Sequence, residues 1–304
     1  MKQILYAVAS IAFFFLMLCF PKETLEGAKE GLLLWFQIVL PTLLPFLIAT
    51  NLLISTNSIF YISRLCGPLF QRLFCVSPNG SFAVLAGFLC GYPVGAKVTA
   101  DMVKTNRITL TEGKYLLSFC NNTSPAFITG YIVMQNLKEE TLMFPTLLIL
   151  YLSPVLCSFI FRRWYHIRPR QTAFCKTQEK PLFFTFDILD HGILNAFKTI
   201  TKIGGYIILF SILFSFGKRL PSAVIFSLLE ITNGIPCILS SISNIYASYT
   251  LVLALSSFGG ICAIAQTKAM LGGTKLSIVS YTLEKLITAA VTSLLALSYI
   301  KIMV

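Results

Sequence analysis

Apolar runs long enough to cross a bilayer dominate this sequence. Residues 31–54 and 141–161 contain no charged side chain, and about 20 consecutive apolar residues suffice for a transmembrane helix. Only 12% of all residues are charged, about half the share in soluble domains, and the mean hydropathy is +0.79. The 304 residues allow about eight or nine membrane passages. The sequence therefore predicts an all-helical polytopic membrane protein and excludes a sizeable aqueous catalytic domain.

Basic residues are distributed unevenly along the chain. It has 24 Lys and Arg against 12 Asp and Glu, a formal net charge of +12. In a membrane protein such residues mark the loops that stay in the cytoplasm, so we predict no nucleic-acid partner. The densest basic cluster is the polar linker 162–189. Placing it and the amino terminus in the cytoplasm assigns 18 of the 24 basic residues to that side, Lys285 among them. We therefore predict a multi-pass protein of the cell membrane in this orientation.

The amino-terminal residues 1–24 form an apolar segment of their own. Residues 4–20 are apolar, Lys2 precedes them, and no small-residue cleavage pattern follows them. We predict an uncleaved signal anchor. A signal peptide that is removed is the alternative.

The segment around residues 91–97 is too short to cross the membrane and return as two spans. Residues 81–90 offer only ten largely apolar positions before the irregular Gly-Tyr-Pro-Val-Gly-Ala-Lys at 91–97. Irregular backbone survives at membrane depth only where protein buries it or water reaches it. We therefore predict a re-entrant hairpin with its tip at 91–97, and a second one with its tip at 230–234. Polar residues, Gly and Pro interrupt residues 57–80, which predicts a helix at the membrane interface.

The same order of features occurs twice along the chain. We divide it into a first repeat at 25–161 and a second at 190–304. Each has a kinked span, a re-entrant hairpin, a broken span and a closing span, and Pro41 and Pro45 supply the first kink. Equivalent points of the repeats are separated by three predicted spans, at 31–54, 114–135 and 141–161. An odd number requires the repeats to be inverted, an arrangement typical of transporters.

Five short motifs carry a resemblance to a known family. In chain order they are L-P-x-L-L-P-F at 40–46, G-Y-P-x-G-A-K at 91–97, S-F-x-N at 118–121, L-E-x-T-x-G at 229–234 and F-G-G at 258–260. With them the chain resembles the nucleoside-recognition (Gate-domain) proteins from about residue 25 to the end. It most resembles the YlbJ-type sporulation integral membrane proteins and is more distantly similar to concentrative nucleoside transporters.

The resemblance to concentrative nucleoside transporters implies where a site lies. In those transporters two re-entrant tips and two broken helices surround the solute and its coupling cation. The matching segments of this chain are therefore expected to meet near the middle of the membrane, at 91–97, 119–125, 230–234 and 257–266. The transporters carry a Gln-Thr-Glu cluster at the first tip, where this chain has Tyr92-Pro93-Val94. Nucleoside specificity therefore does not carry over.

Glu230 is the strongest candidate for a functional residue. An acidic side chain in an apolar context costs roughly 2.5–3.5 kcal/mol at a helix centre, so it is normally paired or functional. We expect it to bind a coupling proton or Na⁺, or to accept hydrogen bonds from a solute. The alternatives are a salt bridge to Lys218, Arg219 or another basic residue, or a position near the surface. For Lys97 we weigh contact with an anionic or carbonyl group, pairing with Glu230, and extension to the interface.

The remaining candidates lie at the tips and breaks. Glycine and proline at the first tip permit a tight turn. The polar residues at 121–124 interrupt a span and expose helix ends suited to ions or polar solutes, with helix–helix hydrogen bonding as the alternative. The predicted solute-binding residues are Gly91, Tyr92, Pro93, Gly95, Lys97, Asn121, Asn122, Thr123, Ser124, Glu230, Thr232, Asn233, Gly259, Gly260 and Gln266.

The function predicted from these features is recognition or transport of a small polar, nucleoside-like solute by alternating access during sporulation. The alternative is a membrane factor or scaffold for envelope or spore maturation that transports nothing. Nucleotide-binding and hydrolase motifs are absent. We therefore predict no enzyme and no bound cofactor or metal beyond the coupling proton or Na⁺. Expected partners are the bilayer and the solute, with a second copy of the chain or other sporulation membrane proteins as further options.

Overall fold

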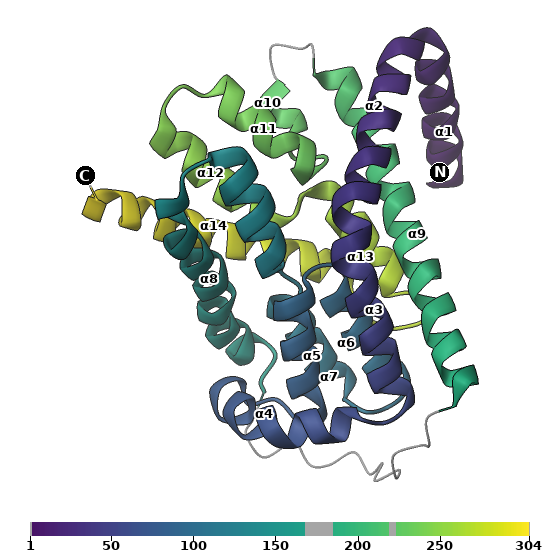
Figure 1. Cartoon of the computed structure of the whole chain (residues 1–304), viewed down its shortest axis with the longest axis vertical. Helices are drawn as coiled ribbons and strands as arrows, with labels where there is room; N and C mark the ends of the chain where they lie inside the picture. Colours follow the sequence, from purple (N-terminus) through teal and green to yellow (C-terminus); the bar gives the residue numbers. More distant parts are fainter. Residues whose placement is uncertain (1, 168–184, 219–222, 304) are drawn as a thin grey trace.

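The computed structural model describes residues 2–167, 185–218 and 223–303, and helices account for most of them (Figure 1). Before the linker the elements are α1 (Lys2–Cys19), α2 (Pro21–Leu34), η1 (Trp35–Val39), α3 (Leu40–Ser55), α4 (Ile59–Phe74), α5 (Pro78–Cys90), α6 (Val94–Lys104), α7 (Leu110–Cys120), η2 (Phe127–Leu137), η3 (Glu140–Leu142) and α8 (Met143–Trp164). After it they are α9 (Phe186–Gly217), α10 (Ala223–Phe226), α11 (Ile231–Ser241), α12 (Ile245–Phe258), α13 (Gly260–Met270) and α14 (Ile278–Met303). These described ranges contain no strand, so the predicted all-α class is confirmed.

Five helical segments are long and apolar enough to cross a membrane. They are Pro21–Ser55 (α2, η1 and α3), Glu140–Trp164 (η3 and α8), Phe186–Gly217 (α9), Ile245–Met270 (α12 and α13) and Ile278–Ile302 (α14). Large apolar side chains are exposed on them, such as Phe36, Phe144 and Leu294. Such a surface suits contact with lipid. The chain is therefore a multi-pass integral membrane protein.

The predicted signal anchor forms a helix, α1, which lies beside α2 in Figure 1. Its apolar stretch Tyr6–Cys19 is shorter than the five candidate spans. Its role as a signal anchor stays a prediction.

A π-helical segment, Trp35–Val39, precedes Pro41 and Pro45, and the helical segment runs without a break from Pro21 to Ser55. The kink at the two prolines stays a prediction. Proline has no N–H to donate. The Thr42 hydroxyl instead donates to the carbonyl of Ile38 (2.6 Å), on the π-helical turn. The wider turn lets the span continue past both prolines.

The first hairpin consists of α5 and α6. Their 13 and 11 residues give lengths of about 20 and 17 Å, below the ~30 Å of the hydrocarbon core. The end of α4 meets α5 at 90°, and α4 lies across the lower end of the molecule in Figure 1, in line with the interfacial helix predicted at 57–80. Ser77 caps α5 by accepting the N–H of Gly80 (3.0 Å). Glu112 of α7 accepts the N–H of Ser77 (2.6 Å), which fastens α7 to the hairpin.

The second hairpin consists of α10 and α11, joined by residues 227–230. It occupies the upper half of Figure 1, whereas α5 and α6 occupy the lower half. Irregular residues 121–124 separate α7 from η2, and Gly259, with a φ of +88°, separates α12 from α13. The structure therefore contains a helix break after each hairpin, at the predicted places. The inverted repeat itself stays a prediction.

Most of the predicted linker 162–189 lies outside the described residues, which stop at 167 and resume at 185. The orientation of the chain in the membrane therefore stays a prediction. One basic residue lies elsewhere than the charge count assumed. Lys285, assigned to the cytoplasmic side, is only 2% exposed and lies inside the protein on α14, because buried oxygen atoms accept hydrogen bonds from its ammonium group.

Candidate functional site

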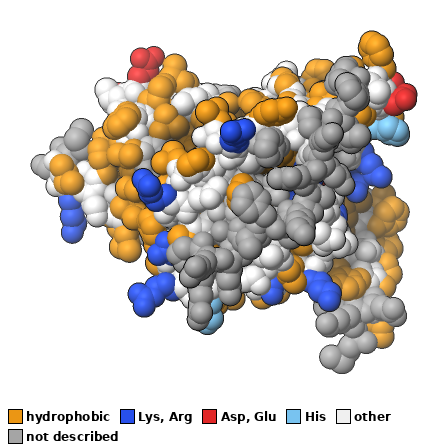
Figure 2. Space-filling view, turned by 90° about the horizontal axis from the view of Figure 1, so that it is seen from below, with side chains coloured by type: hydrophobic (Ala, Val, Ile, Leu, Met, Phe, Trp, Pro, Cys, Tyr) orange, Lys and Arg blue, Asp and Glu red, His pale blue; other side chains and the backbone are white. Residues whose placement is uncertain are grey.

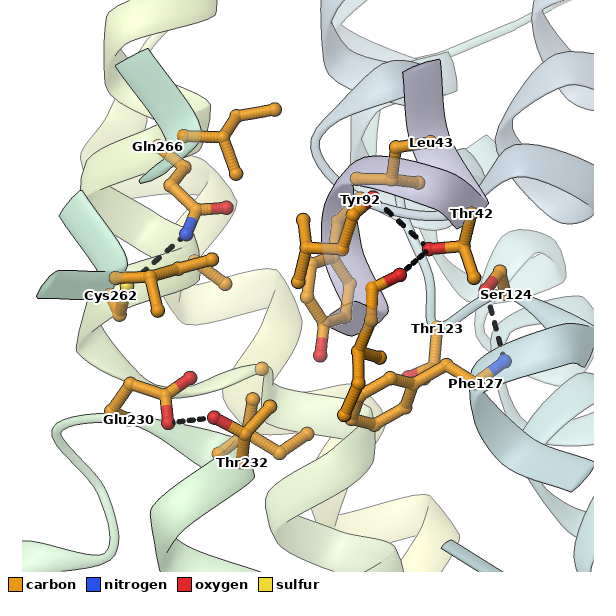
Figure 3. Close-up of a pocket in the computed structure, with 17 residues that line it drawn as sticks. Thr42, Leu43, Tyr92, Thr123, Ser124, Phe127, Glu230, Thr232, Cys262 and Gln266 are labelled. Atoms are coloured by element: carbon orange, nitrogen blue, oxygen red, sulfur yellow. Dashed lines mark hydrogen bonds between the residues drawn. The ribbon is translucent and has the colours of Figure 1, made fainter. Parts of the chain in front are cut away.

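The two hairpin tips and the two helix breaks meet at one cavity (Figure 3). Its volume of about 60 Å³ holds a few water molecules or a partly hydrated ion. Pockets for drug-sized ligands are larger, about 300–1,000 Å³. Of the predicted site residues, those that line the cavity are Tyr92, Thr123, Ser124, Glu230, Thr232, Gly259 and Gln266. The cavity therefore brings together one or more residues from each of the four predicted segments.

The first tip turns at Gly91, whose φ of +82° is a conformation that glycine adopts without steric cost. The next N–H, of Tyr92, donates to the carbonyl of Asn122 (2.7 Å). This bond joins the tip to the first helix break. The Tyr92 ring extends into the cavity, between the wall that carries Glu230 and the wall that carries Thr42 (Figure 3).

The second tip places Glu230 at the amino-terminal end of α11. Its Oε2 accepts hydrogen bonds from the hydroxyl of Thr232 and from the N–H of Asn233 (2.9 Å). These bonds cap the helix, where an anion also meets the positive end of the helix dipole. Glu230 is 2% exposed, and its other oxygen points toward the cavity (Figure 3). The carboxylate thus holds the tip through Oε2 and also lies in the cavity wall.

No ion pair joins Glu230 to any basic side chain that the structure describes. Lys218, a predicted partner, lies 3.4 Å from Glu30 instead, and Arg219 lies outside the described residues. Across residues 2–167, 185–218 and 223–303, no three His, Cys, Asp or Glu side chains gather as metal ligands. Buried carboxylates are normally paired or neutral, so Glu230 is suited to a proton or a monovalent cation.

The second tip is also joined to the helix break that follows it. The N–H of Ile261, in the first turn of α13, donates to the carbonyl of Leu228 (2.8 Å). In the first half a main-chain bond also joins tip and break, but there the tip residue Tyr92 is the donor and Asn122 of the break is the acceptor. A further bond, from the Thr123 hydroxyl to the carbonyl of Ser256 (2.8 Å), connects the first break to α12, just before the second break.

Asn121 lies behind the cavity wall, and its side chain joins three helices. Its Oδ1 accepts the N–H of Ala96 on α6 (3.1 Å). Its Nδ2 donates to Thr267 on α13 (3.1 Å) and to Tyr281 on α14 (2.8 Å). Asn121 is 1% exposed, so these bonds replace water at every polar atom of the amide. The arrangement favours the helix-joining alternative for this residue.

We expect Asn121→Ala to destabilise the protein by about 3 kcal/mol, since three buried groups lose a partner at roughly 1 kcal/mol each. The Asn136→Ala variant is the control, because Asn136 makes one bond, to the carbonyl of Tyr131 (2.8 Å), and should cost about 1 kcal/mol. Unfolding of the purified chain in detergent measures both. Equal losses would contradict the structural role of Asn121.

A buried lysine supports the same break. Lys285 donates to the main-chain oxygen of Asn121 (3.0 Å) and to Oδ1 of Asn122 (3.3 Å). The last carbonyls of a helix carry the negative end of its dipole, so the ammonium group stabilises the broken end of α7. This role of Lys285 was not predicted, although two adjacent charges inside a long apolar run, Glu284 and Lys285, could have indicated it.

The other predicted residues also lie outside the cavity wall. Lys97 donates to Asn51 (3.0 Å) and Asp101 (2.9 Å) rather than meeting Glu230, and Asn233 donates to Ser211 (2.9 Å). The predicted residues that do not line the cavity are Gly91, Pro93, Gly95, Lys97, Asn121, Asn122, Asn233 and Gly260.

Part of the cavity wall was not among the predicted residues. Thr42, Ile203, Ile207 and Phe127 line it from α3, α9 and η2. Thr42 could have been found, because it lies between two prolines that disturb the helix. The apolar residues carry no sequence signal that separates a cavity wall from a surface in contact with lipid.

Comparison with known proteins supports the membrane class. The chain is 25% identical to the sporulation integral membrane protein YlbJ of Bacillus subtilis (strain 168) over 321 aligned residues, which cover 91% of this chain and 79% of that protein. No family model and no solved structure match the chain. The likeness to nucleoside-recognition proteins therefore stays a prediction. The chain is an integral membrane protein related to a sporulation membrane protein.

Proposed function

We propose that this chain is a transporter-like membrane protein that binds a small polar solute at the central cavity and moves it by alternating access. The observation that carries the proposal is the buried carboxylate of Glu230, directed into a cavity where two hairpin tips and two helix breaks meet. Irregular backbone inside a membrane protein is tolerated around polar cavities. The relation to YlbJ supports a setting in spore formation.

The cavity chemistry favours a coupling proton or Na⁺ at Glu230. The cavity lining also includes neutral oxygen-bearing side chains, with Thr232 and Gln266 on the same side as Glu230 and with Thr123 and Ser124 across from it (Figure 3). Oxygen ligands suit hard cations. A volume of about 60 Å³ accommodates such an ion with a few waters. A larger solute requires the cavity to widen, and its size gives no support for a nucleoside.

The hairpins are the elements whose movement would open the cavity. Each tip is fastened to the break of its own half by a main-chain bond, through Tyr92 in the first half and Ile261 in the second. Displacing one tip exposes the cavity to one side while the other tip still closes it. Short elements bounded by irregular backbone are suited to such a motion.

Transport can be tested without knowing the solute. The purified full-length chain is reconstituted into proteoliposomes, and a panel of small polar metabolites is offered under Na⁺ and proton gradients. We expect one or more solutes to accumulate only with protein and a gradient. If no solute moves under any gradient, the transport proposal is wrong.

The alternative is a sporulation factor that uses the same scaffold for assembly with other membrane proteins. It is favoured by the similarity to a sporulation integral membrane protein. A scaffold should tolerate substitution inside the cavity and should fail when exposed residues such as Phe144 or Leu294 are changed. Sporulation efficiency of cells carrying each variant separates the two.

A further inference from the structure

A second hollow, separate from the central cavity, opens at the lower end of the molecule between α3, α6 and α9. It consists of two adjoining pockets of about 160 and 430 Å³ that share Asp101, Lys104 and Asn195. We call the two together the basic crevice. Figure 2 views the lower end, where the described residues show several Lys and Arg side chains and acidic ones only near the rim.

The crevice has an excess of positive charge. Lys97, Lys104, Lys198 and Lys202 line it, and Asp101 is the one acidic residue among its described lining. Asp101 is shared by Lys97 (2.9 Å) and Lys104 (3.7 Å). Four positive charges against one negative charge leave three in excess. An anion entering the crevice is therefore attracted.

Two of the four lysines are available to a ligand. Lys198 and Lys202 lie one turn apart on α9 and are exposed, and neither takes part in an ion pair with a described residue. Lys97 lies deeper, is 8% exposed, and is held by Asn51 and Asp101. The crevice thus has one cation held by hydrogen bonds at its floor, Lys97, and two exposed cations at its mouth, Lys198 and Lys202.

The two exposed lysines lie where the apolar part of α9 begins. The 32 residues of α9 give a length of about 48 Å, longer than the ~30 Å hydrocarbon core, so part of the helix extends beyond it. The uninterrupted apolar run of α9 begins at Ile203, directly after Lys202. Basic pockets between transmembrane helices bind anionic headgroups.

We propose that the basic crevice binds a phosphate group, carried either by an anionic phospholipid or by a soluble phosphorylated molecule. Lysines bind phosphate as point charges, and the combined volume of the two pockets suits a headgroup or a small phosphorylated solute. The site is independent of the proposed transport, because none of its lining residues lines the central cavity.

The test compares the full-length chain with Lys198→Gln/Lys202→Gln. In one arm, native mass spectrometry measures binding of phosphatidylglycerol against phosphatidylcholine. In the other, thermal unfolding in neutral detergent is followed with glycerol phosphate, against sodium chloride of equal ionic strength. Since each lysine near a membrane surface contributes about 1 kcal/mol, the double variant should bind roughly 10- to 30-fold more weakly.

The control is Lys138→Gln/Lys301→Gln, which removes the same charge from exposed positions outside the crevice and should bind as the wild type does. Preferential binding of phosphatidylglycerol identifies a lipid headgroup as the ligand. A rise in the unfolding temperature with glycerol phosphate identifies a soluble phosphorylated molecule. The proposal is overturned if the wild type prefers neither phosphatidylglycerol over phosphatidylcholine nor glycerol phosphate over chloride, or if both double variants lose binding equally. The wild-type preference does not depend on how the variants fold.

Discussion

Replacing Glu230 by Gln should lower coupled transport by roughly 10- to 100-fold, the equivalent of losing one charged hydrogen-bond partner. Gln keeps an oxygen that can accept the N–H of Asn233, so the cap of α11 survives. It removes the negative charge that is directed into the cavity. The measurement is gradient-driven flux in proteoliposomes with the solutes that the wild type accumulates from the metabolite panel.

The matched control for this variant is Glu112→Gln. Glu112 is also buried, at 6% exposure, and also accepts a main-chain N–H, from Ser77. It does not line the cavity. We expect its flux to equal that of the wild type. Unchanged flux in Glu230→Gln, or an equal loss in both variants, would show that Glu230 is not the ion site.

The segments around the cavity could be predicted because broken membrane helices leave strong local signals. Gly91 and Pro93 cannot continue a regular helix at low cost, and Glu230 is expensive in an apolar segment. Each marks a place where the chain must turn or bind something polar. The structure joins these places at one cavity, with Tyr92 and Glu230 in its wall.

The sequence could not predict which polar residues of the breaks line the cavity and which bond to other helices behind its wall. Asn121 and Thr123 are two residues apart in the same break, yet Thr123 lines the cavity and Asn121 lies behind its wall, bonded to other helices. The difference depends on α13 and α14, more than 140 positions later in the chain. Ile203 and Ile207 on α9 resemble residues that face lipid, because periodicity shows a helix face without showing its neighbour.

Buried hydrogen bonds behind the cavity wall hold the helix ends that form it. Lys285 and Asn121 hold the end of α7 through buried hydrogen bonds, whereas the Tyr92 ring is only partly buried. Substitutions behind the wall should therefore act on folding, and substitutions in the wall should act on binding. Measuring stability and flux on each variant separates the two kinds of residue.

A loss of stability as large as that of Asn121→Ala should come from Gly87→Ala. Gly87 lies on α5, where a Cβ atom would overlap the main-chain carbonyl oxygen of Cys120 at the end of α7. A main-chain atom cannot rotate away, so α5 and α7 must separate. Overpacking typically costs 1–3 kcal/mol, and we expect about 3 kcal/mol here, a large share of the roughly 5–15 kcal/mol of a folded domain.

Gly205→Ala provides the matched control, because it makes the same change in a helix where a Cβ meets nothing within 4 Å. Alanine favours a helix over glycine by up to about 1 kcal/mol, so this variant should be as stable as the wild type or slightly more so. Thermal unfolding in detergent measures both variants. If Gly87→Ala unfolds at the same temperature as Gly205→Ala, the close packing of the first hairpin on α7 is wrong. The position of Tyr92 in the cavity wall then loses its support, since α5 carries the first tip.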